Sequence, residues 1–138
     1  MRSAALASRE IAEVEAASKS SAVATCLKRH LEEERANVGE GSKSGGSAGK
    51  PLFSNVELSK LSSPVQGIPA FGLRITADFR IKAPGTKGPF RYYQDFFGFA
   101  VGSAVVVLSD TGSPQPFPAA TEQQLLSLLH SRASTLAA

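Results

Sequence analysis

The stretch that decides the fold is Phe90–Asp110, FRYYQDFFGFAVGSAVVVLSD, in which Phe96 to Ser109 carries no charged side chain. The uncharged run has 14 residues, whereas a helix needs about 20 to cross the hydrocarbon core of a bilayer. Phe, Val and glycine disfavour a helix, and a single strand of about 20 residues would far exceed the usual length. The sequence therefore predicts two buried strands, 90–100 and 104–109, which reverse at Val101-Gly102-Ser103 because glycine readily supplies a positive φ.

Another strand is predicted before this stretch, over residues 70–82, AFGLRITADFRIK. Apolar and polar residues alternate here, which is typical of a strand with one dry and one wet face. The dry positions are Phe71, Leu73, Ile75, Ala77, Phe79 and Ile81. We expect five of them, Phe71, Leu73, Ile75, Phe79 and Ile81, to form the centre of the core, with the C-terminal helix across them. A further strand is predicted near 52–61, and Gly98 is expected to mark a bulge.

Helical periodicity is confined to the two ends of the chain. Residues 3–18 form one predicted helix, capped by Ser3, and residues 22–37 form a second. At the other end, Thr121 and Gln124 have capping-box spacing and open a helix with a leucine stripe. These elements predict an α+β fold, in which an antiparallel sheet of about four strands packs against N-terminal and C-terminal helices in an α/β/α sandwich-like arrangement.

The expected organisation is a single domain with a helical arm at 1–38, a Gly/Ser-rich flexible linker at 39–51, and the sheet with the C-terminal helix at 52–138. The linker GEGSKSGGSAGKP has almost no apolar side chain, so we expect it to be mobile. The N-terminus has no apolar segment of the kind found in signal peptides. As written, the chain is expected to be cytoplasmic and to have no transmembrane segment.

Few residues point to catalysis. Cys26 and His30 are four residues apart on one predicted helix face, so a thiolate–imidazole pair is geometrically feasible. Both fall on the apolar stripe of that helix, so core packing is favoured instead. Tyr93 and Asp95 share one strand face, where a cross-strand hydrogen bond or salt bridge is favoured over catalysis. His130 is interpreted as a helix-surface or edge residue rather than a ligand. The sequence therefore predicts no catalytic, metal or cofactor site, and a protein that is not an enzyme.

The 15 basic and 12 acidic side chains give a net charge of +3, and the excess lies in residues 51–95. The candidate binding residues are Arg74, Arg80, Lys82 and Arg91. Such a basic face suits an acidic protein or an anionic surface. Nucleic acid is not favoured as a partner, because Phe71 and Phe79 point to the opposite face and offer no stacking platform.

The C-terminal region also resembles a known family. The features that carry the resemblance are Tyr93 and Asp95, Val101 and Gly102, the Pro116-Phe117-Pro118 loop, and Glu122, Leu126 and Arg132. Over residues 20–136 the chain is similar to the C-terminal part of actinobacterial cell-envelope proteins of the Mog1/PsbP-like type, many of which are lipoproteins without an assigned activity. The resemblance implies an extracytoplasmic location if the chain is a fragment of an exported protein.

The leading hypothesis is a non-enzymatic binding or interaction module of cell-envelope type, either a monomer or a weak homodimer. The alternative is a small-ligand pocket protein or an enzyme on a curved antiparallel sheet. That alternative predicts a cavity lined by Tyr93, Phe97, Phe99 and Leu73, with Asp95 or Arg74 inside.

Overall fold

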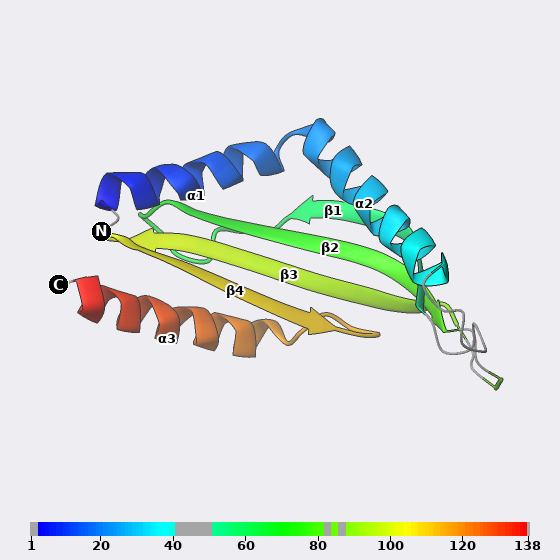
Figure 1. The fold of residues 1–138 in the computed structure, drawn as a ribbon. Coiled ribbons are helices and arrows are strands. Elements are labelled where there is room, and N and C mark those ends of the chain that lie inside the picture. The colour runs from blue at the N-terminus through cyan, green and yellow to red at the C-terminus, as the bar shows by residue number, and fades with distance from the viewer. Residues whose placement is uncertain (1–2, 41–50, 82–83, 86–87, 138) are drawn as a thin grey trace.

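An antiparallel sheet lies between two groups of helices (Figure 1). The computed structural model describes residues 3–40, 51–81, 84–85 and 88–137. The elements run in the order α1 (Ala4–Ser18), α2 (Ser21–Glu40), β1 (Pro51–Lys60), β2 (Ala70–Ile81), β3 (Phe90–Val101), β4 (Ala104–Gly112) and α3 (Ala119–Ala137). This confirms the α+β fold with helices at both ends of the chain. The linker 39–51, predicted to be mobile, lies largely outside the described residues.

The four strands form a meander in the order β1-β2-β3-β4, with every neighbouring pair antiparallel. Val101 pairs with Ala104 across a two-residue turn, and Gly102 adopts a φ of +56°. The reversal predicted at this point is therefore confirmed.

The bulge expected at Gly98 is wrong, because the register runs through this residue without a shift on both sides. Gly98 is needed for a different reason. A Cβ at this position would collide with the ring of Phe71 on the neighbouring strand.

One face of the sheet is covered by α1 and α2. Ala7 and Ile11 of α1 pack on Phe71 and Ala100, with Leu73 and Phe96 at the margin. Leu27 and Leu31 of α2 pack around Val56, Ile75 and Ala77. β2 thus packs its apolar face against α1 and α2. The predicted membership of this core holds for Phe71 and Ile75, which are buried, whereas Leu73 and Phe79 are half-buried.

The opposite face is covered by α3, so the expectation that the C-terminal helix lies across Phe71 and Ile75 is wrong. Leu126 of α3 packs instead on Phe97, Phe99 and Ala70, which point to the other side of the same strands. Phe99 and Leu126 are each 1% exposed. Figure 1 shows α1 and α2 on one side of the sheet and α3 on the other.

The starts of α1 and α3 differ in how well they follow the capping signals in the sequence. The Ser3 side chain accepts a hydrogen bond from the Leu6 backbone N–H at 3.2 Å, as a cap should. The Thr121 cap is wrong, because α3 begins at Ala119, ahead of Thr121. Glu122 consequently falls in the first turn of α3. Within the described residues, no helix is both long enough and apolar enough to cross a membrane.

Candidate functional site

Arg74, the first of the candidate binding residues, is half-buried and paired with a buried carboxylate. Its Nε and Nη2 donate to the two carboxylate oxygens of Asp95, each at 2.7 Å. The pair joins β2 to β3, where the two residues lie directly opposite each other. Asp95 is 1% exposed, and the hydrogen bond to it raises the pKa of the Arg74 guanidinium. The cross-strand salt bridge expected of Asp95 is thus confirmed, with Arg74 as its partner.

Arg91 is also paired. Its Nη1 donates to Asp78 Oδ1 at 3.0 Å, and Asn55 Nδ2 donates to Asp78 Oδ2 at 2.9 Å. These two hydrogen bonds lower the pKa of the Asp78 carboxyl. The guanidinium carbons of Arg74 and Arg91 lie 5.5 Å and 5.9 Å from the centre of the Tyr93 ring, a cation–π arrangement.

Of the other two predicted binding residues, Arg80 is exposed and Lys82 lies outside the described residues. The anion-binding role of the four residues stays a prediction. The charges of Arg74 and Arg91 are already matched by acidic groups within the fold.

Cys26 and His30 do not pack in the core, so that expectation is wrong. Both side chains are exposed, because α2 turns Leu27 and Leu31 toward the sheet instead. His130 is half-buried on α3, and its ring centre lies 5.8 Å from that of Phe99.

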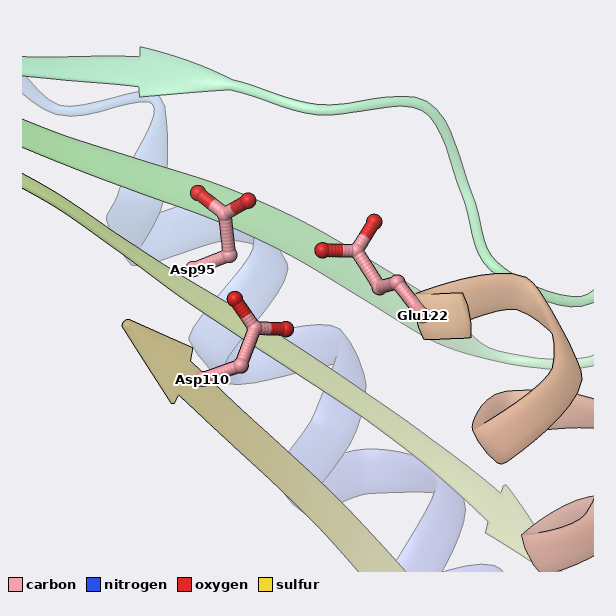
Figure 2. Close-up of side chains that lie close together, drawn as sticks. All are labelled: Asp95, Asp110 and Glu122. Carbon is pink, nitrogen blue, oxygen red and sulfur yellow. The ribbon is translucent and has the colours of Figure 1, made fainter. Parts of the chain in front are cut away.

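Three carboxyl groups come together on the sheet face that α3 covers (Figure 2). Asp95 and Asp110 lie opposite each other on β3 and β4, and Glu122 reaches them from the first turn of α3. One oxygen from each group lies within 4.8 Å of the others. Both oxygens of Asp110 and one of Glu122 are buried without a hydrogen-bond donor. The carboxyl cluster, Asp95–Asp110–Glu122, therefore brings together more negative charge than Arg74 alone can neutralise.

Electrostatics favour a proton in the carboxyl cluster. Burial, a hydrogen bond with Asp110 and the charges of Asp110 and Asp95 raise the pKa of Glu122 to about 7. Burial likewise raises the pKa of Asp110. A protonated Glu122 has one O–H to donate to Asp110, which supplies a partner for one of the two buried Asp110 oxygens.

The same three oxygens have the chemistry to hold a divalent cation. Two features make a proton the better match. Both oxygens of Asp95 already accept hydrogen bonds from Arg74, and the guanidinium would repel a second positive charge at short range.

A pocket of about 300 Å³ lies on the other face of the sheet, where α1 and α2 meet. The side chains that line it are Val14, Ala17, Ser18, Val23, Leu27, Leu58, Leu73, Ile75 and Phe96. Its accessible wall is apolar, since the Ser18 hydroxyl donates to the Glu15 carbonyl of its own helix at 2.6 Å. Figure 1 shows α1 and α2 meeting at an angle over the sheet.

Two lysines are neighbours of residues that line this pocket, and Lys60 pairs across the strands with the lining residue Leu73. Lys19 directly follows the lining residue Ser18. The Nζ atoms of Lys19 and Lys60 lie 3.4 Å and 3.7 Å from Glu15 Oε1. The two ammonium groups thus approach the same carboxylate oxygen.

This pocket differs from the cavity that the sequence suggested. Leu73 does line it. Phe97 and Phe99 instead pack against Leu126 on the opposite face, and Asp95 and Arg74 also point to that side by strand alternation.

Asp110 and Glu122 as site residues, and the pocket between α1, α2 and the sheet, were not predicted from the sequence. The tight turn at Gly102 contained a signal for the first of these. Counting the same number of residues back from Val101 along β3 and forward from Ala104 along β4 brings Asp95 opposite Asp110. Neither the position of Glu122 nor the angle between α1 and α2 has a comparable signal, because both depend on how the helices dock.

Comparison with protein-family models, with curated proteins and with solved structures found no match to this chain. The resemblance to Mog1/PsbP-like proteins therefore stays a prediction.

Proposed function

We propose that this protein is a non-enzymatic binding module that takes a small apolar ligand with an anionic end into the pocket between α1, α2 and the sheet. The observation that carries the proposal is the pocket itself, about 300 Å³ in volume with an apolar accessible wall. Protein sites that bind small molecules have volumes from about 300 Å³ upward and are lined mainly by apolar side chains. The ligand class is therefore a short acyl chain or a compact hydrocarbon body.

The anionic end is inferred from the lysines beside the pocket. Lys19 and Lys60 converge on the Glu15 carboxylate, so a ligand carboxylate or phosphate placed nearby would compete for the same two ammonium groups. Exposed ion pairs of this kind contribute little to stability. Replacement of the Glu15 carboxylate by a ligand carboxylate therefore costs little free energy.

A binding role rather than a catalytic one is supported by the separation of the two sites. A general acid or base must lie within hydrogen-bonding reach of its substrate. The carboxyl cluster lies on the face covered by α3, whereas the pocket lies on the face covered by α1 and α2. The cell-envelope setting implied by the family resemblance is retained as part of this proposal.

The proposal can be tested with an anionic fluorescent naphthalene sulfonate as a probe. The test variant is Ala17→Phe, which fills the pocket from an exposed helix position. The matched control is Ala16→Phe, the same change at an exposed neighbour that does not line the pocket. Ala17→Phe should weaken binding by about tenfold or more, corresponding to about 1.4 kcal/mol, and the control should bind as the wild type does. Equal affinities for all three proteins would contradict the proposal.

A further inference from the structure

The two edges of the sheet are built differently. Only β1 and β4 have a single strand neighbour among the described residues. An exposed edge offers unpaired backbone N–H and C=O groups to another strand, and proteins usually block it with bulges, charges or proline. The two edges can therefore be compared for how well each is blocked.

The β1 edge is blocked. Its register shifts between Ser54 and Glu57, and Asn55 adopts a φ of +50°. Both Glu57 and Lys60 are exposed on this strand. An irregular, charged strand of this kind is a poor template for pairing.

The β4 edge has none of these features over residues 104–109. Its register with β3 is continuous, and residues 104–109 carry no charge and no proline. Glycine at the first central position of the two-residue turn is typical of a type II′ hairpin, in which the pair that closes the turn is hydrogen-bonded. Alternation from Ala104 then leaves the backbone groups of Val105, Val107, Ser109 and Thr111 pointing away from β3. Three of these four residues are exposed, and Val107 is 58% exposed.

We infer that the β4 edge is a self-association surface, through which two copies of this chain pair antiparallel about a two-fold axis at Val107. In this register Val107 lies opposite its counterpart, and Val105 lies opposite Ser109 of the second copy. About six backbone hydrogen bonds form and the two sheets become continuous. A second copy is the favoured occupant because an antiparallel edge is self-complementary under a two-fold axis. The uncharged segment 104–109 also brings no like charges together.

The surface is independent of the proposed pocket, whose lining residues come from α1, α2, β1, β2 and β3. Ligand binding and self-association can therefore fail separately. A loss of probe binding with dimerisation intact would concern only the pocket.

The first test is sedimentation velocity of the full chain from about 10 µM to about 1 mM, the range of a weak interface. A concentration-dependent dimer is expected, and Val107→Lys should weaken it by about tenfold or more. Ser109→Lys is a second edge variant in case Val107→Lys perturbs folding, which far-UV circular dichroism will reveal. Ser54→Lys on β1 is the control and should dimerise as the wild type does.

The second test is crosslinking in a Cys26→Ser background, since Cys26 is exposed. Opposite residues of an antiparallel hydrogen-bonded pair have Cα atoms about 5.5 Å apart, which suits a disulfide. Val107→Cys should therefore give a covalent dimer on mild oxidation, and Ser54→Cys should not. A monomer at all concentrations would overturn the inference, as would a dimer indifferent to both edge lysines or crosslinking at Ser54→Cys alone.

Discussion

Replacement of Glu122 by glutamine should stabilise the protein at high pH and leave its stability unchanged at low pH. The Glu122 carboxyl is held beside Asp110 and Asp95, which together with burial raises its pKa from 4.5 to about 7. The folded chain therefore binds this proton more tightly than the unfolded chain does. The stabilisation is fully present below pH 4.5 and is lost as pH rises through about 7.

The magnitude follows from the size of the pKa displacement. At about 1.4 kcal/mol per unit, a rise from 4.5 to about 7 corresponds to a loss on the order of 3 kcal/mol across this window. Glutamine keeps a donor for the buried Asp110 oxygens and cannot ionise. The variant should therefore exceed the wild type by up to about 3 kcal/mol at pH 8 and match it near pH 4.

The assay is urea unfolding followed by far-UV circular dichroism at half-unit steps from pH 4 to pH 8.5, because the chain contains no tryptophan. The lowered pKa of Asp78 makes a contribution of opposite sign, which is lost as pH falls. That contribution is common to both proteins and cancels in their difference. The matched control is Glu13→Gln, which removes an exposed carboxyl from α1. Parallel stability curves for wild type and Glu122→Gln would refute the reasoning.

Three further changes test the packing by urea unfolding. Arg74→Met leaves Asp95, which is 1% exposed, without its bidentate partner, and should lower the free energy of unfolding by about 3–5 kcal/mol. The double variant with Asp95→Leu should recover much of this loss. Additive losses would contradict the pairing. Phe99→Ala should cost about 3–5 kcal/mol because the ring is 1% exposed beneath α3, and a loss below about 1 kcal/mol would mean that α3 does not cover it. Gly98→Ala should cost about 1–3 kcal/mol by forcing the Phe71 ring aside, and unchanged stability would contradict the close approach.

The strands were predictable from sequence because their signals are local. Alternation over residues 70–82 and a glycine at the reversal of residues 90–109 are both properties of a few consecutive residues. The face on which α3 packs is not local. β3 presents apolar side chains to both sides, with Phe96 on one and Phe97 on the other, so an amphipathic helix has two suitable surfaces.

The partners of the charged residues could not be predicted for a related reason. Arg74 and Arg91 look like free cations along the chain, whereas the sheet register brings Arg74 opposite Asp95 and Arg91 opposite Asp78. Their partners are 21 and 13 residues away in sequence. Counting outward from the turn would have located Asp110, but Glu122 joins the carboxyl cluster only because α3 docks with its first turn above β3 and β4.

The most direct test of the central claim is methyl NMR of the protein with labelled Leu, Ile and Val and a short anionic acyl chain such as octanoate. Binding in the pocket predicts nuclear Overhauser effects from the acyl protons to the methyl groups of Leu27, Leu73 and Ile75. The methyl groups of Leu126, buried on the opposite face, should show none. Contacts to Leu126 in place of Leu73 and Ile75, or no contacts to any of these methyl groups at saturating octanoate, would contradict it.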